Sequence, residues 1–225
     1  MVDVLGHDRF FAAGGDWGSM VTAELGHAYP NHLGGVHMTL PLLPGFDIRA
    51  LTADVFGEDD QWMHARNQEV RAITKVHVMV QANAPQTLAH ALSDSPAGLA
   101  SWLWERRRSW TAPTSNRARD PDFLCATASL YWFTRSIGSS MRLYAEHRAA
   151  PWKPIDGREP LVAAPTGLAV APHELILMPR ALIAERTNLR RWEILPRGGH
   201  FLPVEEPEML IDEYRAFFRP LHQTS

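Results

Sequence analysis

The sequence FFAAGGDWGS, residues 10–19, decides the fold of this chain. It opens with an apolar run of strand-like length and ends where a helical pattern begins at Ser19. Between the two, Gly14 and Gly18 flank one reactive side chain, Asp16. A strand, a tight turn and a helix in this order predict a nucleophile elbow. We expect the elbow to strain its central residue and to leave no room for a Cβ atom on the flanking glycines.

The carboxylate at the centre of the elbow indicates the type of reaction. The usual residue there is serine, whereas Asp16 implies attack on an alkyl carbon and formation of an alkyl-enzyme ester. The motif alone is weak evidence, because aspartate and glycine are common in ordinary turns for reasons of their own. Support must therefore come from other parts of the chain.

Composition and charge indicate an ordinary globular protein. The chain has 225 residues, of which 45% are hydrophobic and 21% charged, and this length predicts one domain or one domain with a large insertion. The net charge of −3 gives no reason to expect nucleic acid or an anionic membrane as a partner. The single cysteine, Cys125, excludes an internal disulfide, and its apolar helical pattern predicts a buried thiol. No apolar run reaches the ~18 residues of a membrane span, and the first residues lack a secretion signal, so we expect a cytoplasmic protein.

Strand and helix patterns alternate at both ends of the chain and predict a mostly parallel sheet. The expected strands are residues 9–14, 33–40, 160–165 and 190–195, and the expected helices are residues 19–28, 58–74, 95–110, 120–133, 136–147 and 205–218. Residues 45–150 show helical patterns and no convincing strand. We therefore predict an α/β protein in which residues 1–44 and 151–225 form the core and residues 45–150 form a helical lid.

Two further reactive side chains follow expected strands. Glu174 lies in the loop TGLAVAPHE after residues 160–165, and His200 lies in the loop PRGGH after residues 190–195. Each has an ordinary alternative, because a carboxylate suits a helix start and a glycine pair suits any turn. The chain order Asp16, Glu174, His200 is nevertheless that of nucleophile, acid and histidine in α/β hydrolases. Because ligands bind beyond the carboxyl ends of parallel strands, we expect the three side chains to converge.

Several stretches, taken together, resemble a known family. GGDWGS, PQTLAHALSDSPAGLASWLWE, PTG…APHE and RGGHF…EEPE closely resemble the microsomal-type epoxide hydrolases, and the resemblance covers nearly all of the chain. It implies a partial α/β-hydrolase fold, with a mostly parallel sheet, a helical lid insertion and no N-terminal strands. It also implies a small apolar epoxide as substrate and neither a cofactor nor a metal.

The resemblance assigns roles to residues of this chain. Asp16 would attack an epoxide carbon, and His200, oriented by Glu174, would activate the water that hydrolyses the resulting ester to a vicinal diol. The backbone N–H of Trp17 would contribute to the oxyanion hole.

Two lid tyrosines of the family donate hydrogen bonds to the epoxide oxygen. The second of these positions falls on Tyr144. The first falls on His77, where the family normally has tyrosine. This departure puts a histidine in the role of a lid acid.

The largest departure from the family is at the beginning of the chain. Family members carry the first strands of the sheet and an HGWP-like loop before the elbow, so we expect the elbow strand here to be a sheet edge. One alternative is therefore a truncated inactive or split-gene remnant, whose partner would be a complementing N-terminal fragment or a second copy of the chain. Another is a haloalkane dehalogenase, which also uses an elbow aspartate followed by tryptophan.

Overall fold

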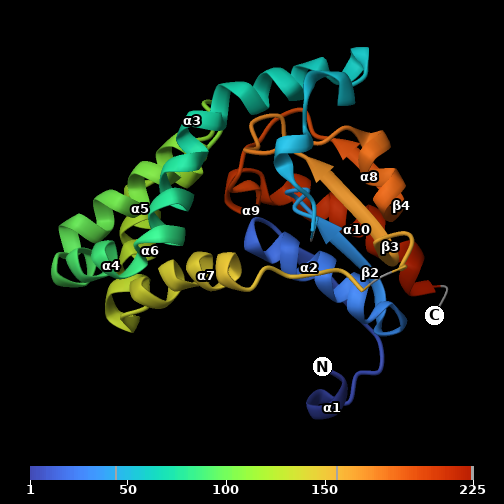
Figure 1. Cartoon of the computed structure of the whole chain (residues 1–225), viewed down its shortest axis with the longest axis horizontal. Helices are drawn as coiled ribbons and strands as arrows, with labels where there is room; N and C mark the ends of the chain where they lie inside the picture. Colours follow the sequence, from blue (N-terminus) through green and yellow to red (C-terminus); the bar gives the residue numbers. More distant parts are fainter. Residues whose placement is uncertain (44, 156, 224–225) are drawn as a thin grey trace.

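Four parallel strands form one sheet in the part of the chain that the structure describes (Figure 1). The computed structural model describes residues 1–43, 45–155 and 157–223. The strands are β1 (Phe10–Gly14), β2 (Leu33–Met38), β3 (Val162–Val170) and β4 (Thr187–Ile194), and they lie in this order across the sheet. Within the described residues β1 pairs only with β2, so the elbow strand is an edge of the sheet.

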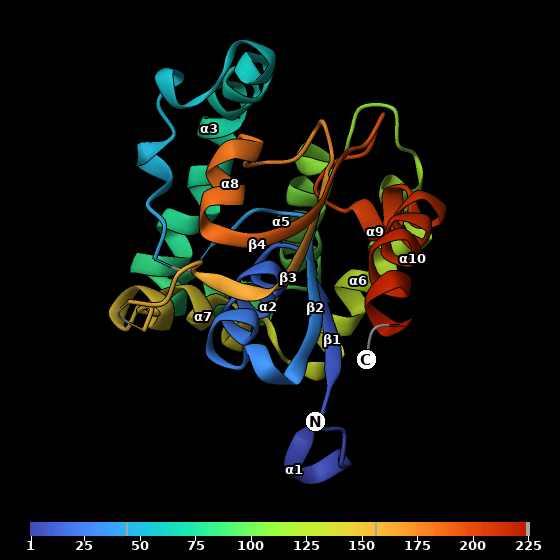
Figure 2. The ribbon, with the colours of Figure 1, turned by 90° about the vertical axis from the view of Figure 1, so that its right-hand side faces the viewer.

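Helices cover both faces of the sheet (Figure 2). Helix α2 (Trp17–Ala28) lies on one face, where a Cβ atom on Gly26 would stand 2.8 Å from Val162 and 3.2 Å from Val36. Helix α10 (Pro207–Gln223) lies on the other face, against Gly35, which precedes Val36 in β2. Neighbouring residues of β2 thus point to opposite helices, as the alternation of side chains along a strand requires.

Five helices stand together to one side of the sheet in Figure 1. They are α3 (Gln61–Asn83), α4 (Pro85–Asp94), α5 (Pro96–Trp110), α6 (Pro121–Thr134) and α7 (Ile137–Ala149). Helices α4 to α7 pack around their own apolar cluster, which includes Leu99 and Met141, and α3 packs against α4 and α7. We refer to these helices as the lid, although its division from the core stays a prediction. Residue 44, the predicted end of the first core segment, lies outside the described residues.

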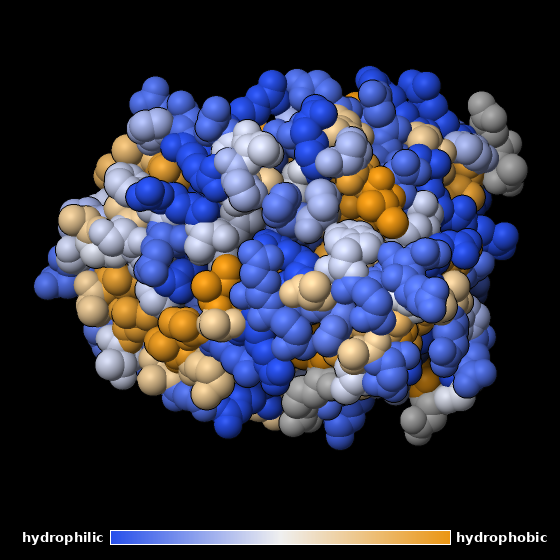
Figure 3. Space-filling model, turned by 90° about the horizontal axis from the view of Figure 1, so that it is seen from above, coloured by the Kyte–Doolittle hydropathy of each residue, from blue (hydrophilic) through white to orange (hydrophobic). Residues whose placement is uncertain are grey.

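Shorter elements complete the described chain. They are α1 (Val2–Leu5), α8 (Arg180–Arg186), α9 (Leu202–Glu205) and the 3-10 turns Pro30–His32, Ile48–Ala50, Ala53–Val55, Glu58–Asp60 and Arg117–Arg119. Among the described residues, no helix combines the length and the apolar character needed to cross a bilayer. Seen from above, the surface is mostly hydrophilic, with separate apolar patches (Figure 3).

Four expectations about the elements and the burial of their residues were wrong. Strand β3 does not end at Pro165 but continues to Val170, because Pro165 lies at an irregularity of the ladder, where a missing N–H does little harm. The lid contains an unexpected helix, α4, and α3 extends to Asn83 instead of residue 74. Cys125 is exposed, because α6 turns its neighbour Leu124 toward the interior.

Candidate active site

The turn between β1 and α2 holds Asp16 in a strained backbone conformation. Its φ of 52° lies in a region that costs energy for any residue except glycine. Buried Ser19 stabilises the turn, since its Oγ donates a 2.8 Å hydrogen bond to the Gly14 carbonyl and accepts one of 3.3 Å from the Leu40 N–H. The predicted elbow is therefore present, and the sequence reasoning missed the contribution of Ser19.

The glycines of the elbow differ in how tightly they are packed. A Cβ atom on Gly14 would lie 2.1 Å from the Gly18 carbonyl oxygen, and one on Gly15 would lie 2.7 Å from Thr39 Oγ1. These two positions require glycine. A Cβ atom on Gly18 meets no atom within 4 Å, so the expectation of a collision there is wrong. The first turn of α2 directs that position into open space.

The structure brings Asp16, Glu174 and His200 together. His200 Nε2 lies 3.2 Å from Asp16 Oδ2, and His200 Nδ1 lies 2.6 Å from Glu174 Oε1. Glu174 is 1% exposed and also accepts a 2.7 Å hydrogen bond from the Leu175 N–H, whereas the Asp16 side chain is 42% exposed. The acid is thus enclosed and the carboxylate of the elbow is open to a ligand. Such a line of carboxylate, imidazole and buried carboxylate is typical of nucleophilic catalysis.

Lid helix α3 anchors the loop that carries Glu174. Arg66 donates hydrogen bonds to the carbonyls of His173 and Glu174, at 3.0 and 3.3 Å. Asn67 forms two 2.8 Å hydrogen bonds with the backbone of Leu177, one as donor and one as acceptor. No local pattern in the sequence indicates these contacts, because the partners are more than a hundred residues apart.

Aromatic side chains of the lid close over Asp16. The rings of Trp17 and Tyr144 meet edge to face at 5.0 Å, and the His77 ring lies 5.6 Å from that of Tyr144. Trp110 links the lid to the triad, since its ring lies 4.6 Å from His77 and 5.2 Å from His200. The structure thus brings the predicted residues Trp17, His77 and Tyr144 to one place. It adds Trp110 as a further aromatic residue beside the triad.

Comparisons with known proteins give the family of the chain. No family model matches the chain. A putative epoxide hydrolase of Stigmatella aurantiaca is 35% identical over 221 residues, which are 96% of this chain and 48% of that protein. Epoxide hydrolase 1 of Sus scrofa is 28% identical over 97% of this chain and 53% of its own length. The chain belongs to the microsomal-type epoxide hydrolase family. It spans about half the length of these relatives.

Solved structures of epoxide hydrolases share the fold. The Aspergillus niger enzyme superposes with a TM-score of 0.77 at 27% identity, over 98% of this chain and 55% of its own. The juvenile hormone epoxide hydrolase of Bombyx mori gives a TM-score of 0.78 at 24% identity, over 99% and 57%. The four parallel strands are therefore part of an α/β-hydrolase fold, as expected.

Two carboxylates control the charge of His200. Burial disfavours the imidazolium, but the charges of Glu174 and Asp16 and their hydrogen bonds outweigh it and raise the pKa of His200 to about 10. Asp16 lies beneath the lid although part of its side chain is exposed, and the resulting loss of water around it opposes its ionisation. The hydrogen bond and charge of His200 outweigh this effect and lower the Asp16 pKa below its ordinary value. The resting site therefore holds an imidazolium between two carboxylates.

The two lid residues near Asp16 are neutral at pH 7. Burial lowers the pKa of His77 to about 4, and the nearby Asp16 charge offsets this only in part. Burial, with the Asp16 charge in addition, raises the pKa of Tyr144 to about 12. His77 Nδ1 is buried and has no hydrogen-bond partner in the described part of the chain. Both side chains thus face the nucleophile as neutral groups that are able to donate a hydrogen bond.

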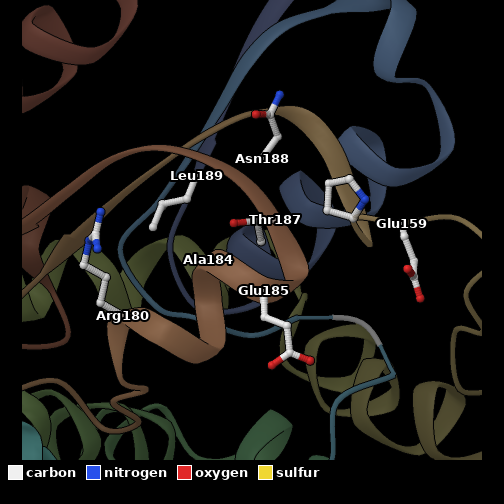
Figure 4. Close-up of a pocket in the computed structure, with 8 residues that line it drawn as sticks. Glu159, Arg180, Ala184, Glu185, Thr187, Asn188 and Leu189 are labelled. Atoms are coloured by element: carbon white, nitrogen blue, oxygen red, sulfur yellow. The ribbon is translucent and has the colours of Figure 1, made fainter. Parts of the chain in front are cut away.

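A pocket on the surface lies away from this site (Figure 4). Glu159, Arg180, Glu185 and Asn188 are among the residues that line it, and it shares no residue with the triad. It is an open depression beside α8 and the start of β4, so it does not compete as the candidate site. Across the residues that the structure describes, no cluster of three His, Cys, Asp or Glu side chains is suited to a metal ion.

Proposed function

We propose that this chain opens an epoxide to a vicinal diol through an ester on Asp16. One observation carries the proposal, which is the bridge that His200 forms between the exposed carboxylate of Asp16 and the buried carboxylate of Glu174. Membership of the epoxide hydrolase family supports the choice of substrate. Because the chain spans about half of its relatives, its activity alone is part of the proposal.

The first step is ring opening. An Asp16 oxygen attacks one epoxide carbon, the bond from that carbon to the ring oxygen breaks, and the oxygen gains the negative charge. His77 and Tyr144, neutral and close enough to interact with the Asp16 charge, donate hydrogen bonds to that oxygen. Tyr144 supplies the proton that completes the alcohol. A donor aimed at a developing oxyanion is worth about 100- to 1000-fold in rate.

The second step is hydrolysis of the ester, and the first step prepares it. Alkylation removes the charge of Asp16, which is one of the causes that raise the pKa of His200. That pKa then falls, so the proton of His200 passes through solvent to the Tyr144 phenolate left by the first step. Neutral His200 is then a base for a water molecule. Water attacks the carbonyl carbon of the ester, and the Trp17 N–H, which already hydrogen-bonds the Asp16 carboxylate, stabilises the oxyanion. Collapse releases the diol and restores Asp16.

A single-turnover experiment in water carrying heavy oxygen tests the mechanism, with styrene oxide as substrate and the chain in excess. We expect the label to enter Asp16, because water attacks the ester carbonyl and the diol takes its second oxygen from the enzyme. Label found only in the diol would mean direct attack by water and would contradict the proposal. Asp16→Ala should abolish diol formation, and His200→Gln should trap the ester.

The same assay separates the alternatives. Turnover of styrene oxide only after the N-terminal half of a relative is supplied would identify this chain as one part of a split enzyme. Release of bromide from a bromoalkane, with no diol from the epoxide, would support a dehalogenase instead. We expect diol formation and no halide release.

A further inference from the structure

Glu205 is a buried carboxylate with no role in the mechanism above. It is the last residue of α9 and is 4% exposed. Its Oε1 accepts a hydrogen bond from the Phe201 N–H and its Oε2 accepts one from the Ala112 N–H, both at 2.9 Å. No Lys or Arg forms an ion pair with it within the described ranges. Because an unpaired buried carboxylate is costly, its two amide contacts need an explanation.

The two amides belong to different parts of the molecule. Phe201 follows His200 in the loop after β4, whereas Ala112 lies two residues beyond the end of lid helix α5. One side chain therefore joins the loop of the catalytic base to the lid. Arg66 and Asn67 of α3 likewise join the loop of Glu174 to the lid, through hydrogen bonds to its backbone. The lid therefore holds the loops of both His200 and Glu174.

Further contacts tie His200 itself to this junction. Its N–H donates a 3.2 Å hydrogen bond to the Trp110 carbonyl, and its ring meets the Trp110 ring edge to face. Gly199 passes so close that a Cβ atom would lie 2.7 Å from Ala112 N and 3.1 Å from Glu205 Oε1. The segments that contain His200 and Ala112 therefore touch at consecutive residues, with Glu205 closing the contact.

We propose that Glu205 is a positioning residue, which holds the His200 loop against the lid so that the imidazole reaches Asp16 and Glu174 at once. This inference rests on the proposed function of the site. His200 acts as the base in hydrolysis of the ester, whereas ring opening depends on Asp16 and the lid donors. Loss of Glu205 should therefore slow the second step more than the first.

The arrangement requires a carboxylate. Each oxygen of Glu205 accepts from a separate N–H, so the isosteric Gln would turn an NH2 group toward one of two donors and leave that N–H unpaired. Glu205 also interacts with the charge of His200, beside the nearer groups Glu174, Asp16 and His77. Removing the Glu205 charge should consequently make the His200 imidazolium less stable.

Glu205→Gln in the whole 225-residue chain tests the inference, with Glu208→Gln as the matched control. Glu208 is also glutamate and also faces the lid side, through an exposed 3.1 Å ion pair with Arg117. Its carboxylate hydrogen-bonds Arg117 instead of the Phe201 and Ala112 N–H groups, and its charge reaches the His200 loop at Arg197. Two quantities are measured. NMR titration of the His200 ring needs no substrate, and mass spectrometry of single turnovers with styrene oxide separates ester formation from ester hydrolysis.

For Glu205→Gln we expect a lower His200 pKa and ester hydrolysis slowed by about 100-fold, the loss that a misplacement of about 1 Å causes. Ester formation should change far less, and Glu208→Gln should leave both quantities as they are. An unchanged His200 titration and unchanged ester hydrolysis in folded Glu205→Gln would overturn the inference. Equal slowing of both steps would also overturn it, because that result indicates only a general loss of structure.

A second variant covers failure of Glu205→Gln to fold. Glu205→Asp keeps the carboxylate and its charge but shortens the side chain by one methylene, so that it no longer reaches the Phe201 and Ala112 N–H groups together. It should reproduce the shift in ester hydrolysis. If no variant forms an ester, including the unmodified chain, the proposed function fails, while the His200 titration still decides whether Glu205 acts on the base.

Discussion

Asp16 and His200 each change the protonation of the other, and this mutual effect is the basis of the proposed two-step reaction. The pKa of His200 is about 10 only while both carboxylates are charged. Asp16→Asn imitates the neutral ester without its bulk, so we expect the His200 pKa to fall in that variant. NMR titration of the His200 ring measures it. An equal His200 pKa in the two proteins would mean that alkylation does not prepare the base.

The same pKa predicts how stability depends on pH. Because the folded chain holds the His200 proton up to about pH 10 and the unfolded chain releases it near pH 6.5, the folded state binds more protons between these values. The free energy of unfolding contributed by His200 is therefore complete below pH 6.5 and is lost as the pH rises toward 10. Urea unfolding at pH 6 and pH 9.5 should show this loss. His200→Gln should show a smaller one.

His77 permits a test of the lid donor that differs from the family pattern. Since its pKa is about 4, its N–H is a neutral donor throughout the neutral pH range. We expect His77→Phe to slow ring opening by about 100-fold, the typical cost of one oxyanion donor, and His77→Tyr to retain the rate. Single-turnover rates of ester formation measure both. Ring opening by His77→Phe at the original rate would exclude His77 from this role.

At the scale of single elements, the elbow predicts opposite effects for two glycines of one motif. Gly14→Ala would force a Cβ atom to within 2.1 Å of the Gly18 carbonyl, so the turn must deform, and we expect a strongly destabilised or unfolded chain. Gly18→Ala meets no atom within 4 Å and lies in the first turn of α2. It should be neutral or stabilise the chain by up to about 1 kcal/mol, because alanine favours helix more than glycine does. Thermal unfolding of both variants decides the matter, and equal effects would contradict the assigned packing.

The contact between α3 and the acid loop predicts a second difference between neighbours. Asn67→Ala removes two hydrogen bonds to Leu177 and leaves polar backbone atoms unpaired, which should cost about 1–3 kcal/mol of stability. Gln68→Ala, on the exposed side of the same helix, removes only a contact with His64 and should change little. Urea unfolding compares them. A loss for Asn67→Ala no larger than for Gln68→Ala would show that α3 does not hold the loop.

The sequence was sufficient for the elements and residues whose signals are local. The elbow, the order of Asp16, Glu174 and His200, and the position of each after a strand follow from short patterns, and the structure brings these side chains together. Glu205 illustrates what was not accessible. It stands in the run EEPE beside two other glutamates, and only the fold buries it against a backbone N–H more than ninety residues away. The expected end of β3 at residue 165 was wrong for a related reason. A proline is tolerated where the ladder is irregular, and no local pattern shows where that occurs.

At the scale of the whole molecule, the main feature is the position of the elbow strand at one edge of the four-stranded sheet. Strand β1 carries the elbow, pairs on one side only within the described residues, and lies at the border of the sheet in Figure 2. The relatives are about twice as long as this chain. The strained turn of the active site thus depends on a strand that has a partner on one side, which links catalysis to whatever occupies the other side.

An edge strand with free N–H and C=O groups favours pairing with another strand, so we expect the purified chain to self-associate as its concentration rises. Ala13 is an exposed residue of β1, and Ala13→Lys places a charge on the edge, which opposes such pairing. Sedimentation velocity over a range of concentrations should show a larger species for the unmodified chain and mostly monomer for Ala13→Lys. Ala149→Lys adds the same charge at the exposed end of α7 and should behave like the unmodified chain. A chain that stays monomeric at every concentration, or that Ala13→Lys leaves associated, would show that the β1 edge does not drive assembly.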